Sequence, residues 1–74
     1  MKKGYLAYVV YNLMDGHDLD PVGVFNKLGD AVDTIHQEME DNEDSALISE
    51  MMGTGTVYKE YDRSYNIKEI DVYD

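Results

Sequence analysis

The chain contains no cysteine, no tryptophan and a single proline, and only six of its 74 residues are basic. Without cysteine, neither a disulfide framework nor a zinc-thiolate site can stabilise the fold. A lack of cysteine also fits a reducing compartment. No run of about 18 apolar residues is present that would span a membrane, and no apolar signal segment follows the first residues. We therefore expect a cytoplasmic protein.

The shortness of the chain limits its core. Seventy-four residues make one domain, residues 1–74, because domains seldom fall below about 50 residues. The composition, 43% hydrophobic with seven tyrosines, is that of a folded protein rather than a disordered one. A chain of about 60 residues buries only about 60% of the surface that it exposes when unfolded. Since disulfides are excluded, self-association is the remaining way to enlarge the core, and we expect a homodimer.

Acidic residues outnumber basic ones by sixteen to six, which gives a net charge of −10. This charge repels nucleic acid and anionic membranes, so direct binding to either is not expected. It favours a basic protein partner, or it serves solubility. Residues 15–50 hold eleven acids and one base, Lys27, whereas the acids and bases of the two flanking segments cancel. Because solubility does not require this segregation, the distribution favours a partner-binding surface.

Hydrophobic patterns predict four strands. Residues 4–13 are apolar on both alternating faces, which is typical of a central strand. Residues 14–20 are expected to form an acidic loop, and a bulge is expected near Lys68 or Glu69, where the alternation slips. Residues 45–52 fit either a short second helix, which we favour, or an extended lead-in to the sheet. The predicted strands span residues 4–13, 21–25, 56–61 and 65–73.

The main helix is the clearest predicted element, with Asn26 as its N-cap. At about 100° per residue, an apolar stripe lies opposite an acidic one. The order strand–strand–helix–strand–strand predicts an α+β fold: a four-stranded antiparallel sheet (ββαββ) with the main helix on one face, with or without a short second helix. The face left bare keeps tyrosines and aliphatic residues, and we expect it to form the homodimer interface. The apolar stripe comprises Leu28, Ala31, Val32, Ile35 and Met39.

No residues with catalytic or cofactor-binding chemistry stand out. There is no cysteine nucleophile, and the serines lie in no nucleophile motif. His36 is expected to be solvated on the helix flank rather than to act as a base. The run from Asp15 to Asp20 fails the EF-hand spacing, so a solvated acidic tip is preferred and weak cation binding is left open. The tyrosines are interpreted as packing residues. We therefore expect no enzymatic activity, no cofactor and no metal site.

The strongest signal is a cluster of five acids within residues 38–44. Several of them face the negative end of the helix dipole, which costs about a few tenths of a kcal/mol each, and this indicates another use. A ridge of carboxylates along a helix approaches the charge spacing of one DNA strand, about 3.4 Å. The alternative is an ordinary solvated helix face. The predicted partner-binding residues are an acidic ridge of Asp30, Asp33, Glu38, Glu40, Asp41, Glu43 and Asp44, and a hairpin patch of Asp15, Asp18 and Asp20.

The run from Tyr5 through Gly23-Val24-Phe25-Asn26 to Ala31 and Ile35 resembles small bacteriophage proteins with a hairpin–helix–hairpin order. In size and charge the chain also resembles phage DNA-mimic proteins, among them inhibitors of the bacterial nucleoid protein HU. This resemblance implies a protein of the host cytoplasm that binds the basic DNA-binding surface of a host protein, HU first among them, and displaces DNA. The alternative is a small structural or regulatory phage module that assembles through its tyrosine-rich sheet face, with acids serving solubility.

Overall fold

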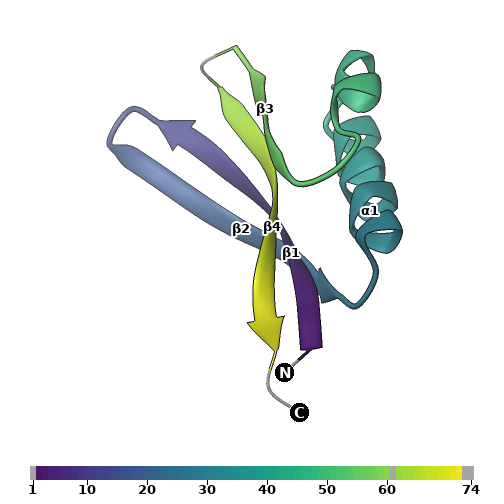
Figure 1. The fold of residues 1–74 in the computed structure, drawn as a ribbon. Coiled ribbons are helices and arrows are strands. Elements are labelled where there is room, and N and C mark those ends of the chain that lie inside the picture. The colour runs from purple at the N-terminus through teal and green to yellow at the C-terminus, as the bar shows by residue number, and fades with distance from the viewer. Residues whose placement is uncertain (1, 61, 73–74) are drawn as a thin grey trace.

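The computed structural model describes residues 2–60 and 62–72, and it has an α+β fold (Figure 1). The predicted class and element order are confirmed, and the short second helix is a 3-10 helix. The ends predicted for the third and fourth strands, Tyr61 and Tyr73, lie outside the described residues. The elements are β1 (Lys2–Leu13), β2 (Gly16–Phe25), α1 (Leu28–Asp41), the 3-10 helix η1 (Ser45–Glu50), β3 (Gly55–Lys59) and β4 (Arg63–Val72).

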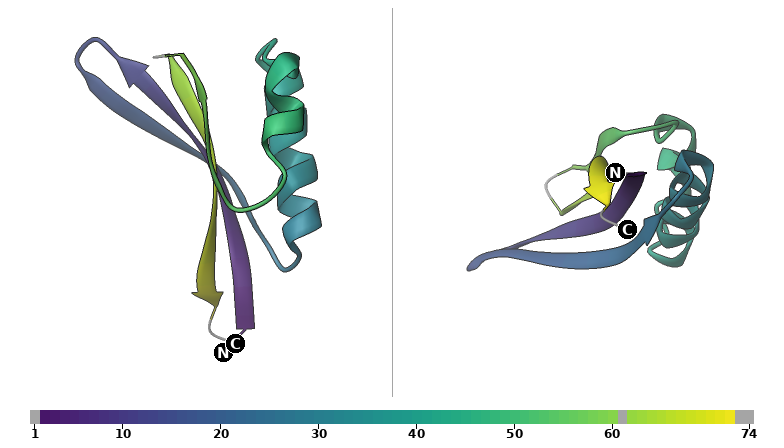
Figure 2. Two further views of the ribbon diagram at one scale, coloured as in Figure 1. Left: turned by 45° about the horizontal axis from the view of Figure 1, so that its top comes forward. Right: turned by 60° about the horizontal axis from the view of Figure 1, so that its bottom comes forward.

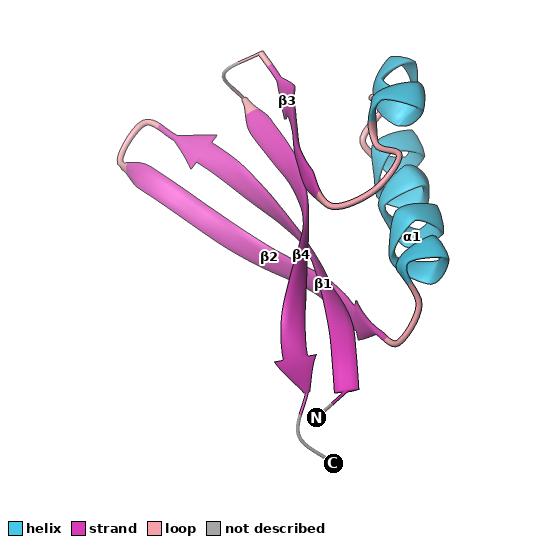
Figure 3. Ribbon diagram, in the orientation of Figure 1, coloured by secondary structure: helices cyan, strands magenta, loops and turns pink. Residues whose placement is uncertain are grey.

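The four strands form one antiparallel sheet in the order β2-β1-β4-β3 (Figure 3). β1 is therefore a central strand, as its two apolar faces predict. α1 lies along one side of this sheet, and within the described residues no helix covers the other side (Figure 2). The two sides are called here the helix side and the open face.

The core lies between α1 and the sheet. Ala7 pairs with Ile67 and Val9 pairs with Tyr65, so these four side chains share the helix side. The odd-numbered residues of β1 thus face α1, and the even-numbered ones face the opposite direction. The fully buried apolar residues are Ala7, Val9, Ala31, Ile35, Met39, Met51, Tyr65 and Ile67.

The first hairpin is tighter than predicted. Only Met14 and Asp15 form its turn, and β2 begins directly after them. The prediction of a loop through residue 20 is therefore wrong, since Asp18 and Asp20 are strand residues in register with β1. Aspartate has a low strand propensity, but β2 is an edge strand, where charged side chains reach water while the backbone pairs.

The irregularity of the sheet also lies elsewhere than predicted. β1 and β4 pair without a register shift past Lys68 and Glu69, so the bulge predicted there is wrong. The register shifts instead between β1 and β2, where Val22 is the extra residue. The broken alternation of β4 has another cause. Ile67 faces α1 and Ile70 faces the open side, so the two apolar sets of this strand serve different faces.

α1 begins one residue later than predicted. Lys27 is the N-cap, with no side-chain hydrogen bond to the helix, so the predicted cap at Asn26 is wrong. The predicted periodicity is confirmed, because the buried residues of α1 are Ala31, Ile35 and Met39. The apolar stripe therefore fixes which side of α1 faces the sheet, even though its first residue is not capped by a side chain.

The acidic cluster continues past the end of α1. The helix ends at Asp41, and Glu43 adopts a φ of 63°, in the left-handed region. The backbone N–H of Glu43 donates to the carbonyl of Glu40 at 3.0 Å, and that of Asp44 donates to the carbonyl of Met39 at 2.6 Å. This pair of bonds is a Schellman motif, which closes the helix and reverses the chain. Glu43 and Asp44 consequently do not extend the helical ridge.

η1 and the residues after it fold back along α1. Nε2 of His36 lies 2.8 Å from the carbonyl oxygen of Met51, and because a carbonyl only accepts, this nitrogen carries the proton. His36 is half-buried, so the expectation that its side chain is solvated is wrong. Among the described residues, neither α1 nor η1 has the length and apolar run of a membrane-crossing helix.

Candidate acidic interaction surface

Four acids of the predicted ridge project from the outward face of α1. Asp30, Asp33, Glu40 and Asp41 are exposed, and helical geometry places them within an arc of about 100°, opposite the buried stripe. Glu38 lies on the flank of the helix and is half-buried. The structure therefore brings these five residues onto α1, with four of them pointing directly away from the sheet.

The four outward acids are divided into two groups. Asp30 and Asp33 lie near the start of α1, and Glu40 and Asp41 lie at its end, about 10 Å farther along the axis. Gln37 stands between the groups and donates a hydrogen bond from Nε2 to Oδ1 of Asp41, at 3.1 Å. The last turn of α1 holds no basic residue. The second group thus faces the negative end of the helix dipole without local compensation.

Glu43 adds a third carboxylate to this second group. It is exposed and occupies the left-handed position after the helix, which is usually glycine. The left-handed conformation costs a residue with a Cβ about 1 kcal/mol. Glu40, Asp41 and Glu43 are called here the C-terminal trio. Within the described part of the chain, none of the three forms an ion pair.

Asp44 does not belong to this surface. It is only 4% exposed, and its carboxylate accepts a hydrogen bond from the Tyr65 hydroxyl. Oδ2 of Asp44 also lies 3.1 Å from Nε of Arg63, and Asn42 donates to the Tyr65 hydroxyl at 3.2 Å. Asp44 is therefore not part of the exposed acidic ridge predicted from the sequence, because the chain reversal after α1 turns this residue towards β4.

The network around Asp44 joins the end of α1 to β4. Burial, together with the hydrogen bond to Asp44, raises the pKa of Tyr65 well above its ordinary value, so the hydroxyl keeps its proton. The Arg63 Nε–H lacks hydrogen-bond geometry, so its contact with Asp44 is ionic rather than directional. The Arg63 guanidinium also lies 5.9 Å from the centre of the Tyr11 ring, within cation–π range. Sequence patterns give no signal for this network, because 21 residues separate Asp44 from Tyr65.

The hairpin patch lies on the same side of the sheet as α1. Asp18 and Asp20 are exposed and pair with Tyr11 and Val9, two residues of the helix side. Asp15 is exposed in the turn itself. This turn and the C-terminal end of α1 lie towards the same end of the molecule (Figures 1 and 2). The hairpin patch and the C-terminal trio are thus exposed on one side of the sheet, towards one end.

Successive side chains of β2 point to opposite faces of the sheet, so the hairpin residues with metal-binding side chains do not lie together. His17 belongs to the open face, where its Nδ1 lies 2.7 Å from Oδ1 of Asn12, whereas Asp18 and Asp20 belong to the helix side. In residues 2–60 and 62–72, no group of three such side chains is close enough to hold a metal ion. The same residues enclose no pocket. What the described residues offer is a surface of carboxylates.

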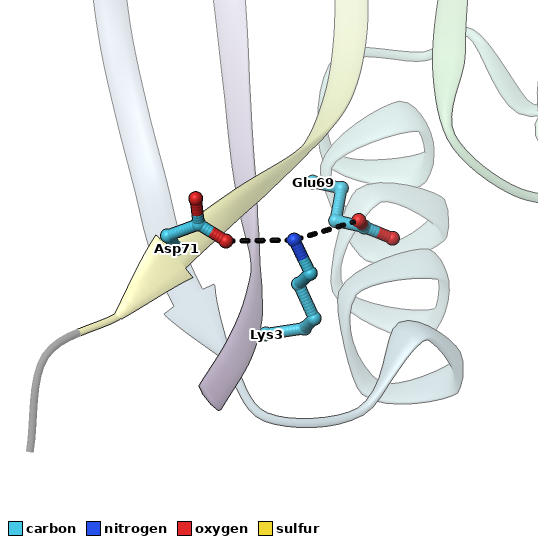
Figure 4. Close-up of polar contacts among 3 residues, drawn as sticks. All are labelled: Lys3, Glu69 and Asp71. Atoms are coloured by element: carbon cyan, nitrogen blue, oxygen red, sulfur yellow. Dashed lines mark hydrogen bonds and ion pairs between the residues drawn. The ribbon is translucent and has the colours of Figure 1, made fainter. Parts of the chain in front are cut away.

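Two acids of β4 are partly offset by a lysine. Nζ of Lys3 lies 2.7 Å from Oδ1 of Asp71 and 3.7 Å from Oε1 of Glu69 (Figure 4). The hydrogen bond that Lys3 donates to Asp71 is the main cause that raises the pKa of Lys3 above its ordinary value. All three side chains are at least half exposed, so the cluster adds little stability. Its effect is to reduce the negative charge on this part of the sheet.

No protein-family model matches the chain, and neither a curated protein nor a solved structure matches it. Support for a function therefore comes from the chain's own surface. Its main chemical feature is the exposed carboxylates of the C-terminal trio and the hairpin patch, which form no ion pair with any described residue.

Proposed function

We propose that this chain is a DNA-mimicking inhibitor that binds the basic DNA-binding surface of a host protein and displaces DNA from it. The observation that supports this most is the placement of the C-terminal trio and the hairpin patch on one side of the molecule, as exposed carboxylates without an ion-pair partner in the described residues. A protein surface that attracts phosphates attracts such carboxylates by the same electrostatics. Inhibition of this kind is competition for a surface and needs neither a cofactor nor a catalytic residue.

The spacing of the acids also favours mimicry of a phosphate backbone. Asp30 and Asp41 are separated by about 17 Å along the axis of α1, and four outward acids lie within that length. One DNA strand places roughly five phosphates over the same distance, at about 3.4 Å each. The helix therefore approaches the charge of a strand, although its acids are gathered at the two ends. The hairpin patch adds further carboxylates at the end that carries the C-terminal trio.

The first candidate partner is the nucleoid protein HU, which the resemblance to phage DNA mimics indicates. The test uses labelled duplex DNA bound to purified HU, with fluorescence anisotropy as the signal. Adding the chain should release the DNA, and the concentration needed should rise steeply as salt is increased, because salt screens charges on exposed surfaces. If HU does not respond, a pull-down from bacterial lysate, eluted with salt and competed with DNA, should yield another basic DNA-binding protein.

The decisive variant neutralises the C-terminal trio with Glu40→Gln, Asp41→Asn and Glu43→Gln. Asp44 is left unchanged because it stabilises the fold. Exposed charge pairs contribute about 0.2–1 kcal/mol each, so the variant should need roughly ten times more protein to release DNA. Circular dichroism should show an unchanged fold, since the three side chains are exposed.

The matched control removes the same amount of charge elsewhere, with Glu50→Gln, Glu60→Gln and Asp62→Asn. These acids are also exposed, and they lie outside the ridge and the hairpin patch. If the control weakens displacement as much as the trio variant does, bulk charge and not the trio is responsible. If no basic DNA-binding protein is captured and the chain only associates with itself, independently of added DNA, the structural or regulatory module is the better explanation and mimicry is rejected.

A further inference from the structure

No helix covers the open face (Figure 2), which is mainly apolar along the middle of β1 and β2 and carries the polar side chains of Thr56, Ser64 and Asn66 on β3 and β4. It consists of the even-numbered residues of β1 together with the residues that pair with them in β2 and β4, and the even-numbered residues of β3. Its most exposed apolar side chains are Leu19, Val24 and Tyr58, which are 57%, 56% and 67% exposed. Tyr8 and Val10, at the centre, are half-buried by their neighbours alone. None of these five packs against the core on the helix side.

The charge of the open face is unlike that of the whole chain. The net charge is −10, yet no strand residue that faces this side within the described ranges is a carboxylate. The acids of β2 and β4 all face the helix side, and the charged side chains on the open face are Lys2 and Lys68. Two copies of a strongly acidic chain repel each other in most orientations. They can meet through this face without placing carboxylates against carboxylates.

The open face is also large enough for a stable contact. Three of the strands have ten residues or more and are at least about 33 Å long, whereas β3 has five residues and is about 17 Å long. With about 4.8 Å between strands, the face covers roughly 550 Å² in projection. Side-chain relief makes the accessible area greater than the projection. A standard interface buries about 800 Å² on each partner. A second copy seated squarely on this face therefore provides the area that a specific dimer needs.

We infer that two copies of this chain pack open face to open face, as a twofold dimer with the two sheets in the centre and one α1 on each outer side. The association enlarges a core that is small in one copy, where eight apolar residues of the described ranges are fully buried. It also separates the two acidic surfaces, which point in opposite directions. If the proposed function holds, the dimer has two independent sites and binds two partner proteins instead of presenting one continuous acidic strip.

The test measures the mass of the chain by sedimentation equilibrium over a range of concentrations. The wild-type chain should show twice the 8.5 kDa of one copy. Leu19→Glu with Val24→Glu places carboxylates on the open face of β2, at side chains that are more than half exposed, and should raise the dissociation constant at least tenfold. The matched control, Met14→Glu with Met52→Glu, alters two exposed apolar residues outside the open face and should remain dimeric.

Salt distinguishes this inference from the proposed function, because the two effects have opposite signs. Raising salt from about 50 mM to about 500 mM screens the repulsion between two acidic copies and should strengthen the dimer, whereas it should weaken binding to a basic partner. If the chain is still a monomer at about 0.1 mM in high salt, its association free energy is weaker than about 5.5 kcal/mol and the dimer is rejected. If the Leu19/Val24 variant dimerises as tightly as the wild-type chain, the open face is not the interface. The same conclusion follows if the Met14/Met52 control dissociates as much as the Leu19/Val24 variant.

A second variant applies if the Leu19/Val24 double variant does not fold by circular dichroism. Lys68→Glu exchanges one exposed charged residue for another on the open face, and Lys27→Glu makes the same exchange at the start of α1. The first should dissociate the dimer and the second should not. The opposite result, or equal masses for both, rejects the open face as the interface.

Discussion

The buried carboxylate of Asp44 provides the most direct test of the structure. In Asp44→Ala, the Tyr65 hydroxyl loses its acceptor and Arg63 loses its counter-ion, while both stay close to the core. Removing one member of a buried ion pair costs about 3–5 kcal/mol. Because the Arg63 side chain is 24% exposed, water recovers part of that loss, and we expect a decrease of about 3 kcal/mol in the free energy of unfolding. A chain of this length is stabilised by only about 4–11 kcal/mol.

The measurement is urea unfolding followed by far-UV circular dichroism. With a slope of about 1–1.5 kcal/mol/M, the midpoint should fall by roughly 2–3 M. The matched control is Asp41→Ala, three residues earlier and exposed, which should change stability by at most about 0.5 kcal/mol. In a double-mutant cycle with Tyr65→Phe, Asp44 and Tyr65 should show a coupling of about 0.5–3 kcal/mol. If Asp44→Ala is no more destabilising than Asp41→Ala, the buried network is not formed, and Asp44 should be counted among the exposed acids.

Two further predictions follow from the same end of α1. Glu43→Gly should stabilise the fold by about 1 kcal/mol, because glycine adopts the left-handed φ of 63° without strain. Calorimetry should show a melting temperature about 4–8 °C higher. A lower melting temperature would show that the Schellman turn is not formed. The contribution of Tyr65 to stability should be complete below about pH 10 and decline above it, because the raised pKa of Tyr65 makes the unfolded chain lose that phenolic proton first. Tyr65→Phe should lessen the decline in urea titrations between about pH 10 and 12, and an identical decline in both proteins would contradict the assignment.

Local sequence patterns were sufficient to predict the helix and the strands, but not the residues at which they begin and end. The apolar stripe of α1 recurs every turn, so Ala31, Ile35 and Met39 were predicted to be buried without knowledge of the sheet. The N-cap and the start of β2 were predicted wrongly. Asn26 has a capping side chain, but the backbone enters the helix one residue later. Asp18 and Asp20 have low strand propensity, but the hydrogen bonds that β1 offers on its edge outweigh it.

The candidate surface was predictable to a similar degree. Helical spacing alone places Asp30, Asp33, Glu40 and Asp41 on the solvent side of α1, and they are exposed there. Charge density along the chain did not distinguish Asp44 from its neighbours, although it is buried. That difference depends on the Schellman turn and on residues of β4, which lie far away in the sequence.

The sequence by itself therefore determined the α+β class, the outward face of α1 and the concentration of acids in the middle of the chain, because each depends on residues within a few positions of one another. Only the tertiary structure decided which acids are surface groups, on which side of the sheet the hairpin patch lies, and that the open face has no carboxylate among its described strand residues. These depend on strand register and on the chain reversal after α1. A shift of one residue in register would move every side chain of β2 to the other face.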